Sequence, residues 1–317
     1  MLSGTLRRMG KHLTRRELLS LVLVSAIPPR AATAEQRTAP TEMKTLGLLG
    51  GTSWRSTVEY YRYINQAVND YYGNNTDPPL IIYNLNQREI HDLQLQDHWD
   101  KIADIYSDAA IRLRTAGAQA VLFAANTPHK VYPEVSRRIG IPVLHIADAA
   151  GLAIQRAHLA KVGLLGTKYT MEDGFIPQWL KAHYGIEVIV PTSRPTRDEL
   201  HRIIQKELGM GVFKPSSKQF VLVQIEDLRQ QGAQGIILGC TEFTLIISQG
   251  DVQIPAFDTT RLHAQMGVDF ILGRVRLDRR VDCRGAALPI RTPFPETKAP
   301  RRTESGFGGK CASRGAL

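Results

Sequence analysis

Two short segments decide the fold: Leu46-Gly47-Leu48-Leu49-Gly50 and, 116 residues later, Val162-Gly163-Leu164-Leu165-Gly166. The likeness continues downstream, where the motif Leu-Arg-x-x-Gly-Ala-Gln at 113–119 recurs at 228–234 and Ile-Pro at 141–142 recurs at 254–255. The offsets are 116, 115 and 113 residues, and the order along the chain is the same. Matched motifs in one register indicate an internal duplication. The sequence therefore predicts two similar halves, which we expect to be related by a pseudo-two-fold axis.

Each half has the pattern of a parallel-sheet protein. Short apolar runs alternate with longer amphipathic segments between residues 43 and 272, which is typical of repeated βαβ units. The strands expected are Thr45–Leu49, Leu80–Tyr83, Ala120–Ala124, Val143–Ile146, Val162–Leu165, Glu187–Val190, Gly235–Leu238 and Ala256–Phe257. The expected helices include Ser56–Tyr71, Trp99–Thr115, Ser217–Gln231 and Thr260–Leu272. The predicted fold class is α/β, with residues 43–142 and 256–272 in the first domain and residues 143–255 in the second.

The first 34 residues have the features of an export signal. Basic residues from Arg7 to Arg16 precede the apolar stretch Leu18–Ile27, and small residues at 32–34 offer a cleavage site. The pair Arg15-Arg16 resembles a twin-arginine signal. We expect residues 1–34 to be a signal peptide, residues 35–42 a linker, and the protein to be periplasmic. Translation from Met43 would instead leave it in the cytoplasm.

The charge of the chain resides in its ends. The formal net charge is +10, yet residues 43–272 sum to −1. Residues 273–317 are rich in Arg, Pro and Gly and are expected to form a disordered basic tail. We therefore expect no nucleic-acid partner. No apolar run reaches the roughly 18 residues of a membrane span, and three cysteines are too few for a disulfide scaffold.

The chemistry is expected where the duplicated strands end. Ligands of open parallel sheets bind beyond the carboxyl ends of the strands, and two facing halves bring those ends to one cleft. At the offset of 115, Cys240 corresponds to Ala125, Thr241 to Asn126 and Glu242 to Thr127. Cys240 is the one cysteine between residues 43 and 272. A following helix N-terminus would lower its pKa, and a thiolate there can accept a carbon-bound proton.

Four motifs together resemble the aspartate/glutamate racemase family. They are Gly47-Leu48-Leu49-Gly50-Gly51-Thr52-Ser53-Trp54, Asn126-Thr127-Pro128-His129-Lys130, Gly166-Thr167-Lys168-Tyr169-Thr170-Met171 and Gly239-Cys240-Thr241-Glu242. The likeness spans residues 43–272. It implies an amino-acid substrate, an active site between the two halves, and racemisation without pyridoxal phosphate, other cofactor or metal. A homodimer is a further expectation.

The resemblance also assigns roles to individual residues. In that family two cysteines act on opposite faces of the α-carbon, and Cys240 matches one of them. Glu242 and His129 become the groups that set its protonation state. The substrate carboxylate would contact Asn126, Thr127 and Thr241, with Thr52 beside them. Arg88 or Gln94 would reach the substrate side chain, although no lysine in Lys206–Gly211 aligns securely, so both acidic and neutral amino acids stay open.

One position departs from the family pattern. Ala125 stands where the family has its first cysteine, or threonine in a broad-specificity group, and a methyl group cannot transfer a proton. A water activated by a neighbour such as His129 could replace it. Alternatively, Cys240 could work on one face, as in the arylmalonate decarboxylases, which resemble these racemases and keep a single cysteine. A third reading is an exported amino-acid-binding protein.

Two other kinds of site are weighed and set aside. The spacing of Gly47, Gly50 and Gly51 differs from the dinucleotide fingerprint. His91, Asp92, Asp97, His98 and Asp100 crowd one stretch, but they fall on an expected loop and helix start. We expect no metal ligands among them.

Overall fold

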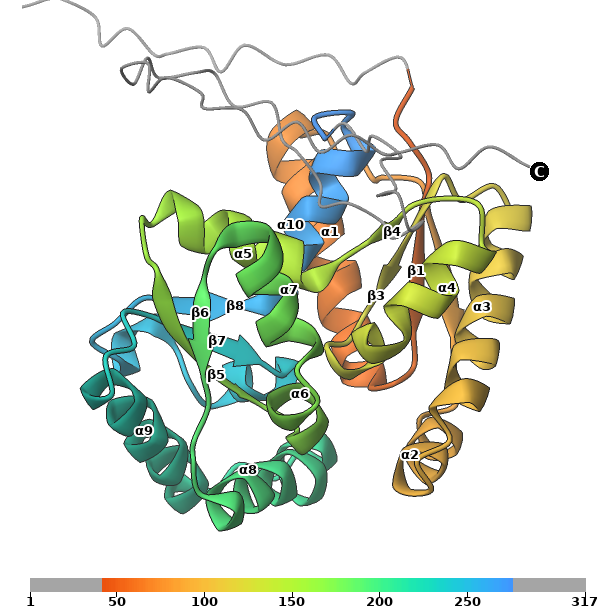
Figure 1. Ribbon diagram of the computed structural model, residues 1–317. Coiled ribbons are helices and arrows are strands. Elements are labelled where there is room, and N and C mark those ends of the chain that lie inside the picture. The colour runs from red at the N-terminus through yellow and green to blue at the C-terminus, as the bar shows by residue number, and fades with distance from the viewer. Residues whose placement is uncertain (1–41, 276–317) are drawn as a thin grey trace, which may run out of the picture. The chain divides into compact units, whose positions relative to one another are not determined.

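The computed structural model describes residues 42–275, which form two four-stranded parallel sheets with helices on both faces (Figure 1). The first sheet has the order β2-β1-β3-β4 and the second the order β6-β5-β7-β8. The strands are β1 (Leu46–Gly50), β2 (Leu80–Asn84), β3 (Ala120–Phe123), β4 (Val143–Leu144), β5 (Lys161–Gly166), β6 (Glu187–Ile189), β7 (Ile236–Gly239) and β8 (Ala256–Asp258). All eight predicted strands are confirmed. The identical strand order of the two sheets confirms the duplication as well.

Helices cover each sheet on two sides. In the first half, α1 (Trp54–Tyr72) and α10 (Thr259–Ile271) pack on one face, while α3 (Trp99–Thr115) and α4 (Tyr132–Arg138) pack on the other. In the second half, α5 (Ile146–Arg156) and α7 (Phe175–Tyr184) lie opposite α8 (Arg194–Lys206) and α9 (Pro215–Gln230). The shorter elements are α2 (Gln87–Leu95), α6 (Lys168–Glu172) and the 3-10 turns η1 (Thr127–Val131), η2 (Leu208–Met210), η3 (Thr241–Leu245) and η4 (Gln249–Asp251).

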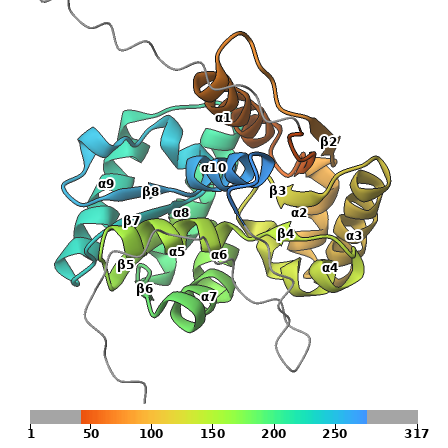
Figure 2. The ribbon, with the colours of Figure 1, turned by 90° about the horizontal axis from the view of Figure 1, so that it is seen from above.

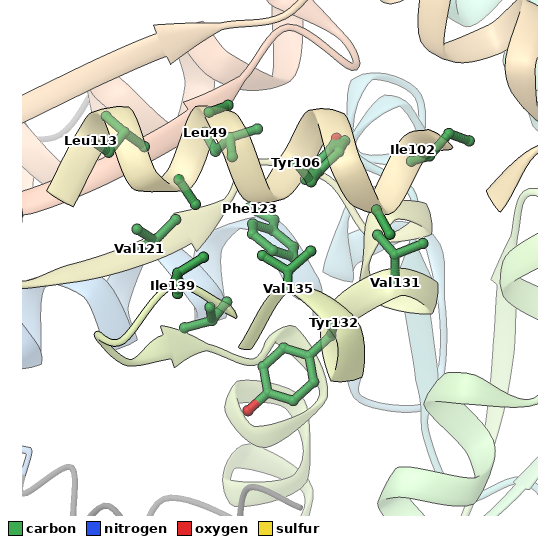
Figure 3. Close-up of a cluster of buried hydrophobic side chains, with 14 of the residues drawn as sticks. Leu49, Ile102, Tyr106, Leu113, Val121, Phe123, Val131, Tyr132, Val135 and Ile139 are labelled. Atoms are coloured by element: carbon green, nitrogen blue, oxygen red, sulfur yellow. The ribbon is translucent and has the colours of Figure 1, made fainter. Parts of the chain in front are cut away.

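The central strands are buried because both of their faces are covered. Every residue of β1 is buried; Leu46 and Leu48 face the α1 side, whereas Leu49 joins the α3 side. Figure 3 shows the latter core, where side chains of α3 and α4 close over β3. Tyr106 packs edge-on against Phe123 there, with ring centroids 5.1 Å apart. This packing holds α3 in place and so fixes the Tyr106 hydroxyl, which reaches the site described below.

The chain passes from one sheet to the other one short strand later than the predicted domain boundaries, at both crossings. The prediction placed β4 at the start of the second domain, but β4 pairs with β3 in the first sheet. The prediction placed β8 in the first domain, but β8 pairs with β7 in the second sheet. The chain crosses only after each of these strands, because α5 packs on the second sheet and α10 on the first. The two crossing helices contact each other between the halves (Figure 2).

Several sequence predictions fall on parts of the chain that the structure does not describe. Residues 1–41 hold the predicted signal peptide and nearly all of the linker, and residues 276–317 hold most of the predicted tail with Cys283 and Cys311. Within the described residues, none of the helices combines the length and apolar character needed to cross a lipid bilayer.

Three buried histidines meet where the chain crosses between the halves. His129 of η1 lies 4.8 Å from His145 and 5.5 Å from His263, measured between ring centroids. His263 is held by the Tyr60 hydroxyl at 3.0 Å and the Leu144 carbonyl oxygen at 3.0 Å. Burial lowers the pKa of all three imidazoles, that of His129 to about 4. They are therefore neutral in the folded protein at neutral pH.

This cluster predicts loss of stability in mild acid. Below about pH 6.5 the unfolded chain binds protons at these histidines while the folded chain does not, so acid favours unfolding. Each histidine contributes a slope of about 1.4 kcal/mol per pH unit, which for His129 persists down to its folded pKa of about 4. Urea unfolding between pH 7 and pH 5 measures the sum.

The variant His145→Asn isolates one member of the cluster. Asparagine can still cap α5, where the His145 ring nitrogen Nδ1 now accepts from the Ala147 amide at 3.1 Å, but it does not titrate. The slope of unfolding free energy with pH should fall by about 1.4 kcal/mol per pH unit. The exposed His158→Gln serves as the control for the loss of one histidine from the surface. An unchanged slope in His145→Asn would contradict the prediction.

Candidate active site

A cavity of about 670 Å³ lies where loops from both halves meet. The loops after β1 and β3 contribute Thr52, Ala125, Asn126 and Thr127. The loops after β5 and β7 contribute Thr167, Cys240, Thr241 and Glu242. The strand ends therefore converge as the duplication predicted, and the residues brought together are those of the quoted motifs.

A glycine determines how the chain leaves β1. Gly51 has a φ of +91°, and a Cβ at this position would lie 2.1 Å from the Leu85 carbonyl oxygen. A side chain there is excluded both by the backbone conformation and by the close approach of the neighbouring loop. The turn delivers Thr52 to the cavity wall, where its hydroxyl forms a hydrogen bond with the Tyr106 hydroxyl.

Cys240 and Glu242 form a hydrogen-bonded pair in the wall of the second half. The Cys240 thiol donates to Glu242 Oε2 at 2.9 Å, and the Thr241 hydroxyl donates to the same oxygen at 2.7 Å. The Ser56 hydroxyl of α1 forms a hydrogen bond with the Thr241 hydroxyl. Because the Thr241 proton is already donated to Glu242, Ser56 is the donor in this bond. This chain of donors joins the two halves across the cavity and ends on one carboxylate.

The protonation state of Cys240 differs from the prediction. Burial and the adjacent negative charge of Glu242 raise the pKa of the Cys240 thiol well above its usual value. The expected lowering by a helix N-terminus is wrong, because the element after Cys240 is a five-residue 3-10 turn whose first turn carries Glu242. Cys240 therefore rests as a thiol with a carboxylate positioned to accept its proton.

The wall of the first half presents Ala125 and its neighbours. Asn126 Nδ2 donates to the Thr259 hydroxyl at 3.0 Å, and the Thr127 and Thr167 hydroxyls lie 3.0 Å apart across the two halves. Ala125 and Cys240 line the same cavity. The arrangement is thus asymmetric: a thiol and a carboxylate on one side correspond to a methyl group and a threonine on the other.

His129, which the sequence predicted as a group that sets protonation in the site, lies against backbone groups beside the cavity. Its Nε2 accepts from the Ile146 amide at 3.1 Å, which leaves the proton on Nδ1, near the Ala125 carbonyl oxygen at 3.0 Å and that of Asn126 at 3.2 Å. The ring is 1% exposed and lies outside the residues that line the cavity. Both nitrogens are engaged with backbone groups, so the ring fixes the shape of the Ala125–Asn126 turn.

Helix α2 supplies one end of the cavity. Arg88, His91 and Gln94 recur every third residue and all line it. Gln94 is buried, whereas the Arg88 side chain is 83% exposed and pairs with Asp92, its Nε lying 2.8 Å from Oδ2. Sequence reasoning considered His91 only as a metal ligand. Its three-residue spacing from Arg88 and Gln94 was the signal that could have placed it here.

Two cations and a hydroxyl were also missed. Arg55 and Ser56, in the first turn of α1, line the cavity, as does Lys206 at the end of α8. Lys206 shares this surface with Arg88 and Arg55. The cavity therefore combines an acid–base pair at its wall with cationic side chains from both halves. Such a cavity can hold an anionic ligand and exchange a proton with it.

Comparisons with known proteins agree with this geometry. The sequence profile of the family described as Asp/Glu/Hydantoin racemase matches residues 49–267. A candidate Asp/Glu racemase from Yersinia pestis is 43% identical, with a TM-score of 0.68 over 73% of this chain and 100% of that chain. An aspartate racemase homologue from Pyrococcus horikoshii is 38% identical, with a TM-score of 0.64 over 72% of this chain and 99% of that chain.

A more distant relative matches only part of the chain. A glutamate racemase from Desulforudis audaxviator is 25% identical over 136 residues, which are 42% of this chain and 48% of that protein. The matched region thus spans about half the length of the curated relatives. The profile match covers most of the chain, and with the two similar structures it establishes that this protein belongs to the Asp/Glu/hydantoin racemase family.

Proposed function

We propose that this protein is a cofactor-independent amino-acid racemase or epimerase that moves the α-proton of its substrate through Cys240. The observation that carries the proposal is the 2.9 Å hydrogen bond from the Cys240 thiol to Glu242, in a cavity at the carboxyl end of β7. Membership of the racemase family supports an isomerase.

The proposed reaction begins with the resting thiol. Glu242 accepts the proton of Cys240, and the thiolate so formed removes the α-proton of the amino acid. The Cα–H electron pair stays on the substrate as a carbanion, which the substrate carboxylate delocalises. Cys240 exchanges the captured proton with solvent through Glu242, and return of a solvent-derived proton from Cys240 restores the original configuration with exchange. Inversion needs a proton from the Ala125 side, and because Ala125 cannot donate one, the proposed donor is a water. The hydroxide left behind is reprotonated by solvent, while Cys240 releases the captured proton through Glu242. The cavity, which Ala125 lines, has a volume of about 670 Å³ and can hold a substrate together with a water.

The polar residues of the cavity would hold the substrate. Thr52, Asn126, Thr127 and Thr241 offer hydroxyl and amide groups that suit an α-carboxylate and an α-ammonium group. Lys206 and Arg88 share the cavity and supply positive charge for a second carboxylate. We therefore propose an acidic amino acid as the substrate, with Gln94 as a further polar group of the same cavity.

A second candidate function is supported by the asymmetry of the cavity. A resting thiol opposite Ala125 suits one-sided protonation of a carbanion formed by loss of carbon dioxide. The two proposals differ in their products. The test is to incubate the protein with each enantiomer of aspartate and glutamate and to separate the products by chiral chromatography. Formation of the antipode supports the racemase. In a parallel incubation with a 2-substituted malonate, release of carbon dioxide supports the lyase if no antipode forms from the amino acids.

The variant Glu242→Gln tests how Cys240 loses its proton. Proton exchange at pH 7 should fall by about 10²-fold, because glutamine cannot accept the thiol proton. The charge of Glu242 raises the pKa of Cys240, so its removal should lower that pKa and the residual activity should increase with pH. Proton exchange followed by NMR between pH 6 and pH 9 measures both effects. Glu59→Gln is the control, because Glu59 is a half-buried carboxylate of α1 that pairs with Arg62.

The result that would contradict this role is specific. Unchanged exchange in Glu242→Gln at pH 7, with the Cys240 dependence intact, would show that another group or solvent deprotonates the thiol.

A further inference from the structure

The segment from Lys206 to Gly211 forms part of the cavity wall in the second half. Lys206, Gly209 and Met210 all line the cavity, although the segment is a helix end followed by the short turn η2. A helix end and a three-residue turn have few internal hydrogen bonds to hold a long cationic side chain in place.

Glu207, the neighbour of Lys206, is anchored inside the protein. Its side chain is 3% exposed, and it lies outside the residues that line the cavity. The carboxylate accepts from the Ser217 hydroxyl, from Arg202 Nη2 at 2.8 Å and from Lys214 Nζ at 3.0 Å. These donors come from α8, from α9 and from the residue before α9. A buried carboxylate is costly unless it is paired, and here three donors satisfy it.

The backbone of Glu207 organises the turn as well. Its carbonyl oxygen accepts from the Met210 amide at 2.9 Å and from the Val212 amide at 2.9 Å, while its own amide donates to the Ile203 carbonyl oxygen at 3.1 Å. Hydrogen bonds to the Glu207 carbonyl oxygen thus hold the turn from Leu208 to Gly211 together. Its position depends on where the Glu207 carboxylate is bound.

The other half of the protein touches the same turn. Arg55 Nη1 donates to the Gly209 carbonyl oxygen at 3.2 Å. Gly211 has a φ of +79°, and a Cβ there would lie 3.0 Å from Arg55 Nη2. The segment is therefore held from inside by Glu207 and from across the cavity by Arg55.

We propose that Glu207 is a positioning residue, which fixes Lys206 at the end of the cavity that receives the substrate side chain. The inference rests on the proposed function and adds a determinant of specificity to it. Glu207 does not contact the substrate; it acts through Lys206. The hydrogen bond from Ser217, followed by those from Lys214 and Arg202, lowers the pKa of Glu207 to about 2, so the anchor is charged throughout the neutral range.

The test compares Glu207→Gln with Glu199→Gln. Glu199 lies on α8 and pairs with Arg202 at 2.7 Å, but it is a surface residue outside the cavity. In Glu207→Gln the KM for an acidic amino acid should rise by about 10-fold, as expected when a residue that orients a ligand-binding group is lost. Its kcat and the KM for a neutral amino acid should change by less than about 2-fold. Glu199→Gln should leave all three constants unchanged.

Ser217→Ala removes a different member of the same anchor. It should shift the KM for the acidic amino acid in the same direction, with a thermal melting temperature close to that of the wild type. Equal changes in KM for acidic and neutral amino acids, or no change in either variant, would overturn the inference.

Hydrogen–deuterium exchange followed by mass spectrometry separates this inference from the proposed function. Peptides covering residues 206–213 should exchange faster in Glu207→Gln than in the wild type or in Glu199→Gln, whatever the enzyme activity. Unchanged exchange in these peptides would show that Glu207 does not hold the segment. Faster exchange in a protein without activity on any amino acid would leave the anchor in place and refute the proposed function alone.

Discussion

Replacement of Cys240 by serine is expected to lower the rate of α-proton exchange by about 10³-fold, within the range that a single acid–base group contributes. A serine hydroxyl is a far weaker acid than a thiol, so Glu242 cannot generate the base that removes the α-proton. Serine is also close to cysteine in size, and Cys240 contacts the buried cluster that includes Leu238 and Phe243. The fold and the binding of the amino acid should therefore persist. NMR in heavy water measures the exchange.

The control for this variant is a binding measurement. Calorimetric titration with the same amino acid should give a similar affinity for the wild type and Cys240→Ser. Exchange at the wild-type rate in Cys240→Ser would contradict the mechanism. Equal binding by both proteins without exchange in either would indicate an amino-acid-binding protein.

Replacement of Ala125 by cysteine is expected to raise the rate of racemisation by about 10²- to 10⁴-fold. Ala125 lines the cavity on the first half, at the position equivalent to Cys240 of the second, so the new thiol would face the bound substrate from the other side. Both faces of the α-carbon would then have a proton donor and acceptor. Chiral chromatography measures how fast the antipode forms. The matched control is Ala125→Ser, whose hydroxyl can carry a proton, unlike the alanine methyl group, but is a weaker acid than the cysteine thiol.

A double variant makes the stereochemical claim sharper. In Ala125→Cys/Cys240→Ser the remaining thiol lies on the opposite side of the cavity. Proton exchange should then switch to the enantiomer that the wild type exchanges more slowly. Racemisation at the background rate in Ala125→Cys, with exchange by Cys240 retained, would show that the protein is not simply one base short of a two-cysteine racemase.

The fold could be predicted because its signals are local. Strands β1 and β5 are apolar runs that end in glycine, and the motif repeated at residues 46–50 and 162–166 established their equivalence. The domain boundaries could not be predicted in this way. Strand β4 has two residues and β8 has three, and the sheet to which each belongs depends on long-range pairing. The helices that cross between the halves follow these strands directly.

The site could be predicted where residues follow strand ends. Asn126, Thr127 and Cys240 line the cavity for this reason. His91 and Lys206 could not be found in the same way, since their place depends on how a helix from each half approaches the cavity.

Two further features of the site could not be predicted from the sequence, for different reasons. The placement of His129 outside the cavity lining depends on the amide that engages its Nε2, which belongs to Ile146, 17 residues later. The low pKa expected for Cys240 failed because the element after it is a short 3-10 turn that carries Glu242.

The most direct test of the account follows the α-proton of each enantiomer separately. The wild-type protein is incubated in heavy water with L- or D-aspartate, and with L- or D-glutamate, and the α-proton signal is recorded by NMR before chiral chromatography. We expect the signal of one enantiomer to disappear faster than its antipode forms, because Cys240 acts from one face and Ala125 occupies the other. Retention of the α-proton in all four substrates, or equal loss in Cys240→Ser, would contradict the account.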